Sequence, residues 1–445
     1  MTSGPFLKKI LIFALPLMLT GLLQLLYNSA DTVIVGRFAG KEALAAVGAT
    51  GSLINLILNI FIGLSMGSGV MEARYIGADD EKSMHRCTHT AMTISVICGI
   101  VVGIFGFFMA GTFLKLMNAP DDVIHLSTRY LQIYFIGAPG SLVYNFGASL
   151  LRSMGDTKRP LYILFASGIV NVVLNLILVI PFGMGVSGVA IATITSQYIS
   201  AVCVVICLTK LGNACRLSLK SLRIYKRELL GIVRIGLPAG IQNSMFSIAN
   251  VIIQSSVNAF GSVAMAGIAA GSNFDGYIYT CTNAIAQTAM NFSSQNIGAG
   301  KYENIGRVFR KCLAITVIIG AAMSCGGYFL REQIIWIFSK EPDVIAIGAD
   351  RLALIMPFYV FCSLQDTVAG QIRGMGKSME PMIISLIGTC GVRLLWIFVV
   401  LPQNHTLMNL YWAYPISWSI TFAALLGLYF SAKRGLVKKK KLLRN

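Results

Sequence analysis

The sequence of 445 residues is poor in charge: only 12% of its residues are Asp, Glu, Lys or Arg, while 56% are apolar. A soluble globular chain carries about 25% charged residues, so a water-soluble enzyme with this composition would have a largely apolar surface. A nucleic-acid-binding protein is disfavoured on the same ground, because a basic patch needs a soluble surface around it. The composition leaves a protein whose excess apolar surface contacts lipid.

Signatures of common active sites are missing as well. The ten cysteines form no C-x-x-C pair, so the sequence predicts neither a structural zinc site nor a redox motif. It also has no P-loop and no H-E-x-x-H motif, which removes the familiar phosphate-binding and metalloprotease patterns. We therefore expect no enzyme activity, no cofactor and no bound metal other than a coupling cation.

The apolar residues gather into long uninterrupted runs. About 20 such residues cross a bilayer as a helix, whereas the strands of a membrane barrel alternate over about ten residues. Backbone groups within lipid must be bonded internally, which favours helices here. The sequence predicts an all-α integral membrane protein with twelve transmembrane helices, at 8–35, 45–71, 89–111, 125–150, 161–181, 188–209, 231–257, 264–291, 312–330, 350–371, 382–401 and 408–431.

Lysine and arginine are distributed unequally between the loops that these spans define. With twelve spans both termini lie on one side, and that side carries 28 of the 36 Lys and Arg, against seven on the other. The positive-inside rule places the more basic side in the cytoplasm. We therefore expect a multi-pass protein of a bacterial-type cytoplasmic (inner) membrane with both termini cytoplasmic, and the net charge of +18 is read as a topology signal.

The chain repeats itself with a spacing of about 221 residues: Pro181 corresponds to Pro402, and Arg152 to Arg373. Six spans in each repeat make the halves parallel, an arrangement that secondary transporters use, with the substrate site at the repeat interface. The predicted domains are an N-terminal six-helix lobe (1–209), a basic amphipathic cytoplasmic linker (210–230), a C-terminal six-helix lobe (231–432) and a basic cytoplasmic tail (433–445).

Asp31 is the acid that stands out. Intramembrane charges are costly, so each is a functional hypothesis, and no basic residue lies in the middle of a span of the same half. A carboxylate there can hold a proton or Na⁺ in alternation with a substrate, as an antiporter requires. We expect Asn171, Asn175 and Thr193 to add oxygens and predict these four residues as the cation-coupling site, with helix–helix hydrogen bonding as the alternative for the two asparagines.

The other intramembrane charges lie in the second half. Arg393 is expected to pair with Asp275 or Asp366, since a lone cation in lipid is also costly; the alternative is that one of these acids acts in coupling or substrate binding. Polar residues of the first and seventh spans recur at helical spacing and share a face. The candidates for substrate or cavity contacts are Gln24, Asn28, Asn145, Asn243, Asn250, Gln254, Asp275, Tyr279, Gln365, Asp366 and Arg393.

Three motifs carry a family resemblance. The stretch Asp31-Thr-Val-Ile-Val-Gly-Arg37 ends the first span, and R-x-M-G motifs begin at Arg152 and Arg373 after the fourth and tenth spans. Together they resemble the multidrug and toxic compound extrusion (MATE) family over essentially the whole chain. The resemblance implies a twelve-helix, two-lobed, V-shaped exporter that exchanges H⁺ or Na⁺ for organic, often cationic, compounds, with Asp31 as the cation-coupling residue.

Two departures from the family pattern leave the coupling ion open. Family members often carry an N-x-x-x-D pair in the fifth span, where this sequence has Asn171 and Asn175. Another branch uses a Glu in the seventh span, and 231–257 contains no acid. The first-span carboxylate is therefore more isolated than the family pattern implies.

These inferences predict a secondary active multidrug exporter that antiports organic compounds against H⁺ or Na⁺ by alternating access. Its partners would be small drug-like substrates, the coupling cation, which as Na⁺ would bind at Asp31, and membrane lipid; we expect a monomer and no nucleic acid. A lipid-linked oligosaccharide flippase of the same superfold is the alternative, but it needs a strongly cationic cavity where the spans offer only Arg393. A non-transporting membrane receptor or an intramembrane hydrolase is an alternative of another class.

Overall fold

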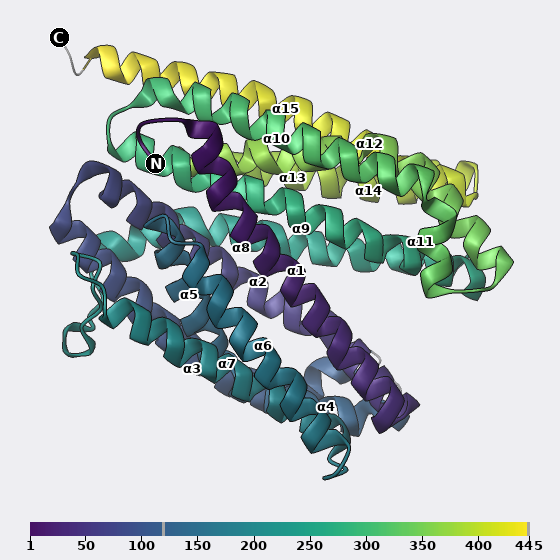
Figure 1. Ribbon diagram of the computed structural model, residues 1–445. Helices are drawn as coiled ribbons and strands as arrows, with labels where there is room; N and C mark the ends of the chain where they lie inside the picture. Colours follow the sequence, from purple (N-terminus) through teal and green to yellow (C-terminus); the bar gives the residue numbers. More distant parts are fainter. Residues whose placement is uncertain (118–120, 443–445) are drawn as a thin grey trace. The chain divides into compact units, whose positions relative to one another are not determined.

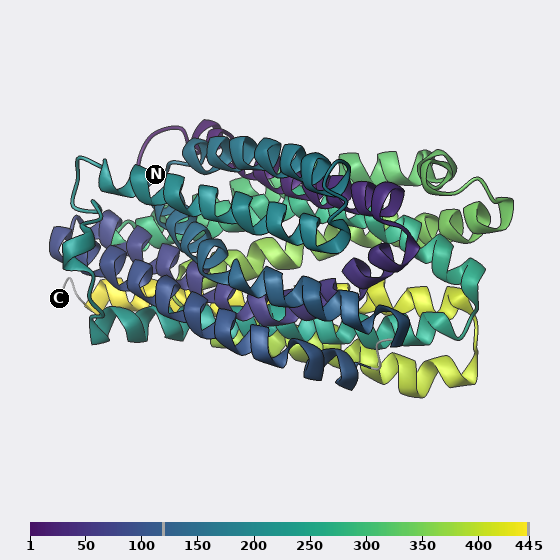
Figure 2. The same cartoon turned by 90° about the horizontal axis from the view of Figure 1, so that it is seen from below.

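The computed structural model describes residues 1–117 and 121–442, and it is helical over almost all of them. Nine helical segments of the described residues are long and apolar enough to cross a membrane. The other three predicted spans, 125–150, 231–257 and 264–291, are helical too, but they are shorter or less apolar. Contacts divide the chain into two compact units, and within each the helices run roughly along a common direction (Figures 1 and 2).

Unit 2 comprises Leu19–Gly240. It contains most helices of the first repeat and the connection that leads to the second. Its elements are α1 (Phe6–Ile34) from Leu19 onward, η1 (Val35–Ala39), α2 (Lys41–Ala78), α3 (Glu81–Leu116), α4 (Asp121–Ile136), α5 (Ala138–Ser153), α6 (Lys158–Val179), α7 (Gly185–Thr209), η2 (Leu219–Ser221) and the first part of α8 (Lys226–Asn258).

Unit 1 comprises Met1–Met18 and Ile241–Asn445. It combines the start of α1 with the rest of α8 and all later helices. These are α9 (Ser262–Gly298), α10 (Tyr302–Phe329), α11 (Arg331–Phe338), α12 (Pro342–Gly374), α13 (Met379–Ser385), η3 (Leu386–Gly391), α14 (Val392–Leu395), η4 (Trp396–Val400), η5 (Leu401–Gln403) and α15 (Leu407–Leu442).

Two helices belong partly to each unit. The division falls after Met18 in α1 and after Gly240 in α8, two residues beyond the repeat-related Pro16 and Pro238 that both helices carry inside them. A proline within a helix lacks the N–H that would bond the preceding turn. Contacts thus divide the chain close to these prolines, whereas the sequence repeat divides it at the linker 210–230. The predicted lobes describe the sequence repeat, do not coincide with the two contact units and stay a prediction.

Several predicted elements differ from the structure. The span 125–150 is two helices that meet at Gly137, where Pro139 near the start of α5 removes a backbone donor. The span 382–401 contains two π-helical turns, η3 and η4, and α11 was not predicted at all. Little of the linker is a regular helix: only the 3-10 turn η2 precedes α8. The first part of the predicted tail continues α15, which ends at Leu442.

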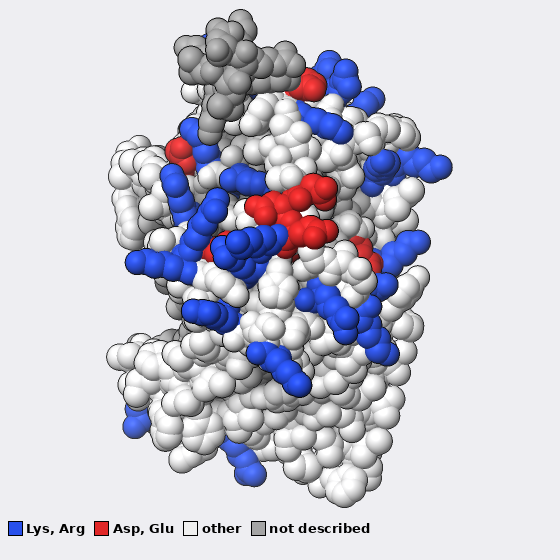
Figure 3. Space-filling view, turned by 90° about the vertical axis from the view of Figure 1, so that its left-hand side faces the viewer, with Lys and Arg blue, Asp and Glu red and all other residues white. Residues whose placement is uncertain are grey.

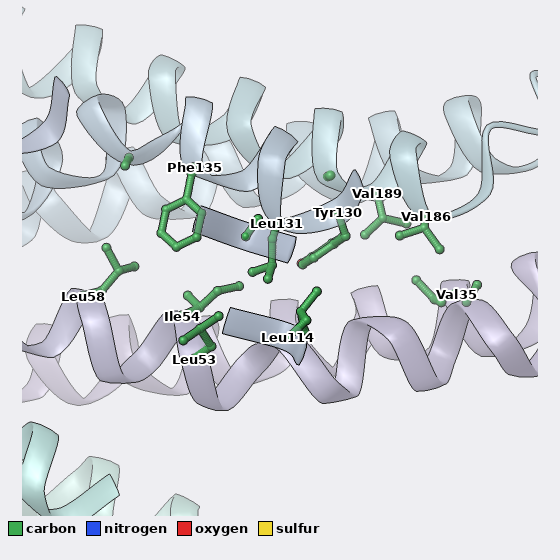
Figure 4. Packing of buried hydrophobic residues seen from close by; sticks show 14 of the residues in the cluster. Val35, Leu53, Ile54, Leu58, Leu114, Tyr130, Leu131, Phe135, Val186 and Val189 are labelled. Atoms are coloured by element: carbon green, nitrogen blue, oxygen red, sulfur yellow. The ribbon is translucent and has the colours of Figure 1, made fainter. Parts of the chain in front are cut away.

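A buried apolar cluster holds the helices of unit 2 together (Figure 4). Leu53 and Leu58 of α2 face Leu131 and Phe135 of α4, and Leu114 of α3 packs into the same layer. In unit 1 a comparable cluster packs the first turns of α1 against α9 and α10. Burial of such side chains stabilises each unit by roughly 1.5–3 kcal/mol per fully buried residue.

Glycines let α2 and α8 approach each other backbone to backbone within unit 2. A Cβ added to Gly236 would lie 2.6 Å from Leu64 Cα and 2.7 Å from Gly63 O. Real Cβ atoms do not approach that closely, and backbone atoms cannot rotate aside as a side chain can. The close approach fixes the first half of α8 on α2 and depends on the absence of a side chain.

We therefore expect Gly236→Ala to push α2 and α8 apart. Overpacking of this kind costs about 1–3 kcal/mol, which predicts a fall of roughly 5 °C in the melting midpoint of the purified protein. Gly51→Ala is the matched control, because Gly51 lies on the partner helix α2 and a Cβ there meets nothing within 4 Å. Equal midpoints for the two variants would contradict the tight helix contact.

Candidate functional site

Asp31 and the two asparagines of α6 meet inside unit 2. Asn175 Nδ2 donates to Asp31 Oδ1 at 2.5 Å and lies 3.3 Å from Asn171 Oδ1. Both amides are buried, and Asn175 Oδ1 has no hydrogen-bond partner among the described residues. Asp31 lies one turn before the end of α1, just ahead of the π-helical turn η1, and single π-helical turns occur frequently at functional sites.

Not every predicted neighbour of Asp31 joins it. Thr193 donates to Val189 O of its own helix α7 at 2.9 Å, and in the described part of the chain it makes no hydrogen bond to the acid. Two tyrosines that sequence reasoning missed, Tyr130 and Tyr134 of α4, lie near enough to interact electrostatically with Asp31. Their spacing of four residues places them on one face of α4, but their approach to α1 depends on tertiary packing.

The polar stripes of α1 and α8 are largely exposed. Gln24, Asn28, Asn250 and Gln254 are open at the surface of the chain, and Asn243 is half-buried. Their polar groups are not buried by contacts within a unit. They stay predicted candidates for substrate or cavity contacts.

Asp275 pairs with an arginine other than the predicted one. Arg351 Nη2 lies 2.6 Å from Asp275 Oδ2, and Tyr359 donates to the carbonyl of Asp275 at 3.0 Å. The expected pairing of Arg393 with Asp275 or Asp366 is wrong: Arg393 Nε donates to Ser417 instead. The sequence had placed Arg351 at the rim of its span, whereas α12 begins at Pro342 and carries it inside the unit.

The remaining candidates make mainly local contacts. Asn145 donates to Ser141 O in its own helix at 2.8 Å, and Tyr279 accepts from Asn283 at 3.0 Å. Gln365 is buried with its Oε1 unbonded, and Asp366 is half-buried. Within residues 1–117 and 121–442, Asp366 forms no ion pair.

Arg373, assigned to a loop by the sequence, is buried at the end of α12. Its Nη2 donates to Gln242 Oε1 of α8 at 2.6 Å. Arg351, Arg373 and Arg393 are therefore all buried in unit 1, where the sequence had counted a single intramembrane arginine. Arg393 is therefore one of several buried arginines in this unit that an anionic ligand could contact.

Sequence reasoning also missed a buried acid in unit 2. Glu72 is fully enclosed and accepts from Thr88 at 3.1 Å and from the Cys215 thiol at 3.0 Å. Burial and the neighbouring carboxylate raise the pKa of Cys215 far above its ordinary value, so the thiol keeps the proton that it donates. Glu72 follows the predicted end of its span by one residue, and only the extension of α2 to Ala78 places it inside.

The same contacts dock the linker on α2 and α3. Ser218 N donates to His89 Nε2 at 3.0 Å, and Tyr225 N donates to Thr90 Oγ1 at 3.1 Å. His89 is the first residue of the predicted span 89–111 and lies well inside α3, which begins at Glu81. The linker therefore enters α8 from a fixed position on unit 2.

An integral membrane transporter is indicated by three features: two six-span repeats, intramembrane acids and an apolar first helix that carries polar side chains on one face. A family model described as MatE matches the chain twice, at residues 16–177 and 238–399. The protein belongs to the MatE family, whose members are transporters and not enzymes. The double match agrees with the internal repeat.

Named relatives cover nearly the whole chain. It is 26% identical over 431 residues to the Probable multidrug resistance protein YoeA of Bacillus subtilis, covering 95% of this chain and 93% of that protein. It is 25% identical over 412 residues to the Probable multidrug resistance protein NorM of Thermotoga maritima, covering 88% and 85%.

Solved structures share the fold. A structure described as a MATE protein in the bent conformation superposes with a TM-score of 0.90 at 21% identity, covering 99% of this chain and 98% of that one. A transporter of the MOP superfamily from Pyrococcus furiosus gives a TM-score of 0.88 at 21% identity, covering 98% and 96%. The predicted all-α fold with twelve transmembrane helices in two parallel repeats is thereby confirmed.

The ion pair of Asp275 and Arg351 can be tested by removing its two charges singly and together. Asp275→Asn or Arg351→Gln each leaves one buried charge without its partner, which costs about 3–5 kcal/mol, so both single variants should melt clearly below the wild type. The double variant removes both charges and should recover much of that loss. Melting midpoints of the purified variants measure this, and strictly additive losses would contradict the ion pair.

Proposed function

We propose that this transporter is a secondary active exporter that antiports organic, often cationic, compounds against H⁺ or Na⁺ by alternating access. The observation that carries the proposal is the hydrogen bond from the buried Asn175 amide to the Asp31 carboxylate, with Asn171 beside Asn175 on the same helix. An acid in a helix of this kind, with amide groups beside it and no basic partner among the described residues, is suited to exchange one bound cation for another.

The chemistry of the site fits either ion. With a proton bound, the Asp31 carboxyl is neutral. Without it, the carboxylate is negative and can hold Na⁺, for which carboxylate and amide oxygens are suitable hard ligands. Asn171 Oδ1 and the unbonded Asn175 Oδ1 would supply two of those oxygens.

A change of charge at Asp31 would act on a helix that both units share. The first turns of α1 pack on α9 and α10, and the chain before them is held by hydrogen bonds from Asn304 Nδ2 to Thr2 O and from Asn296 Nδ2 to Met1 O. The part of α1 that carries Asp31 belongs to unit 2. Binding and release at the acid would therefore bias the packing of a helix with two anchors.

The substrate range follows from the relatives and from the polar stripes. Relatives of this chain are named as multidrug resistance and multidrug export proteins. Exposed amides lie on α1 of unit 2 at Gln24 and Asn28, and on α8 of unit 1 at Gln254. Polar side chains of this kind on otherwise apolar helices are suited to a tolerant recognition of organic molecules.

We place the protein in a bacterial-type cytoplasmic membrane with both termini in the cytoplasm. Figure 3 looks onto the end of the helices near which both termini lie, where blue Lys and Arg side chains outnumber red Asp and Glu. Cytoplasmic loops carry such an excess of basic residues. The side with 28 of the 36 basic residues would be the inner one.

Asp31→Asn should abolish exchange, because an amide can neither bind a proton nor present a negative charge to Na⁺. The measurement is efflux of the organic cation rhodamine 123 from proteoliposomes with an imposed pH or Na⁺ gradient, and the variant should fall to the level of protein-free liposomes. Asp343→Asn, which alters an exposed carboxylate in α12, serves as the control. Gradient-driven efflux by Asp31→Asn at the wild-type rate would refute the proposed function.

Asn175→Ala should shift the ion dependence of transport without removing the carboxylate. A hydrogen bond to a charged group contributes about 1.5–3 kcal/mol, so the ion concentration for half-maximal efflux should change by about tenfold or more. The ion whose titration moves identifies the coupling cation. Ser29→Ala is the control, since its hydroxyl bonds only to Leu25 O of α1; an unchanged titration in Asn175→Ala would separate this amide from the coupling site.

A further inference from the structure

Arg393 is a buried cation without a counter-charge. Of the three buried arginines in unit 1, Arg351 forms an ion pair with Asp275, and Arg373 donates to Gln242. Within the described residues, no carboxylate lies within ion-pair distance of Arg393, although only 7% of this residue is exposed. Placing a charged side chain in a membrane helix costs free energy, so we expect Arg393 to have a functional role.

Two aromatic rings and one hydroxyl hold the Arg393 guanidinium in place. Its central carbon lies 4.4 Å from the centre of the Tyr414 ring and 5.7 Å from that of Trp418, and Nε donates to Ser417 Oγ at 3.1 Å. All three partners belong to α15 and share one face of it. Cation–π contacts contribute about 2 kcal/mol when desolvated, which stabilises the charge and leaves the terminal nitrogens as unused donors.

The unused donors of Arg393 are not sealed off by the chain. Arg351 Nη1 and Arg373 Nε lack partners and are completely enclosed, whereas no unbonded nitrogen of Arg393 is enclosed in this way. The guanidinium is therefore held on one side and partly accessible on another. This is the arrangement of a binding group and not of a structural ion pair.

The backbone around Arg393 is irregular as well. Arg393 lies in the four-residue helix α14, between the π-helical turns η3 and η4. Such turns are rare and are frequently found at functional sites. The repeat-related helix α6 is a regular α-helix over Lys158–Val179, so the distortion accompanies the arginine and is not required by the fold.

The position of Arg393 in the second repeat is equivalent to a position beside the proposed coupling site in the first repeat, and the two sites carry charges of opposite sign. Arg393 corresponds to Val172, which lies between Asn171 and Asn175 on α6. The equivalent helices of the two repeats thus carry the amides of an acidic cation site in unit 2 and an arginine in unit 1. A second cation site at this position is excluded by the charge of Arg393.

We propose that Arg393, with Tyr414, Ser417 and Trp418, forms an anion-binding subsite for a carboxylate or sulfonate of an aromatic organic substrate. The free guanidinium nitrogens donate to the anionic oxygens, for which the planar group is well suited, and the rings contact the aromatic body. Arg393 lies near the middle of the apolar segment Met379–Gln403, far along the helix from the level of lipid phosphates. The subsite rests on the proposed function, because it is assigned to an exported molecule.

Two dyes with the same ring skeleton and different charge test this subsite. Fluorescein carries a carboxylate, whereas rhodamine 123 is a cationic ester. We expect wild-type protein in phosphatidylcholine nanodiscs to bind fluorescein by fluorescence anisotropy. In Arg393→Gln, the fluorescein affinity should fall at least about tenfold relative to the rhodamine 123 affinity. Arg393→Lys keeps the charge but loses the planar group, so it should restore only part of that affinity.

Further variants keep the test decisive. Ser417→Ala leaves the charge but removes the acceptor that orients it, and about a threefold loss of fluorescein affinity is expected even where Arg393→Gln does not fold. Arg331→Gln is the control, because Arg331 makes a similar contact, 5.2 Å from the Tyr328 ring, at an exposed position. An Arg393→Gln protein with an unchanged affinity ratio, or wild-type protein that does not bind fluorescein, overturns the subsite.

The occupant and the transport function are separated by two more measurements. Phosphatidylglycerol added to the nanodiscs should leave fluorescein binding unchanged; if it displaces the dye in wild type but not in Arg393→Gln, a lipid occupies the site and the proposal is overturned. Arg393-dependent binding without gradient-driven efflux of either dye supports the subsite and refutes the antiport function. Gradient-driven efflux of rhodamine 123 without Arg393-dependent binding of fluorescein supports the antiport function and refutes the subsite.

Discussion

Neutralisation of charge away from water is the constraint on which the interior of this protein depends. An ionisable side chain inside a membrane helix is stable only beside an opposite charge, a ring of donors or a water-filled space. Unit 1 satisfies this with the ion pair of Asp275 and Arg351, and unit 2 satisfies it for Glu72 with hydroxyl and thiol donors. Among the described residues, the hydrogen-bond partner of Asp31 is the neutral amide of Asn175, and the proposed cation would balance the charge of the carboxylate.

The same constraint explains why α1 matters mechanically. Its first turns are packed into unit 1 and its last turns into unit 2. The repeat-related α8 is shared in the same way, with its first turns fixed on α2 through glycine contacts. A helix held at both ends cannot accommodate a new charge state by drifting, and any response must be a discrete repacking of one unit against the shared helix. Under the proposed function, this shared helix would connect the binding of a cation to alternating access.

Much of the fold was predictable because the bilayer simplifies the sequence. Apolar length predicted twelve spans, nine of which lie in helices of the described residues that are long and apolar enough to cross a membrane, and the prolines and R-x-M-G motifs located the repeat. Asp31 and Asn175 could be named as candidates because they are polar residues within apolar spans, and the structure joins them by a hydrogen bond. The partner of Asp275 did not follow, because it depends on which residues of α12 lie at the depth of α9, and a span boundary misplaced by about two turns moved Arg351 to the rim. Glu72 was lost for the same reason, and the π-helical turns around Arg393 have no recognisable sequence signature.

The asymmetry between the repeats separates two functions that a symmetric protein would have to combine. The equivalent segments of the two repeats carry the amides beside Asp31 in one case and, in the other, an arginine with no ion-pair partner among the described residues. A carboxylate that must release its cation during each cycle is poorly placed beside an arginine, which would hold it permanently ionised. With Arg393 and Asp31 in different units, the acid would be free to change its charge, and the arginine would be free to bind an anionic group throughout the proposed cycle. The absence of an acid from the predicted span 231–257 is consistent with this proposed division, in which one carboxylate carries the exchanged charge and the second repeat contributes recognition.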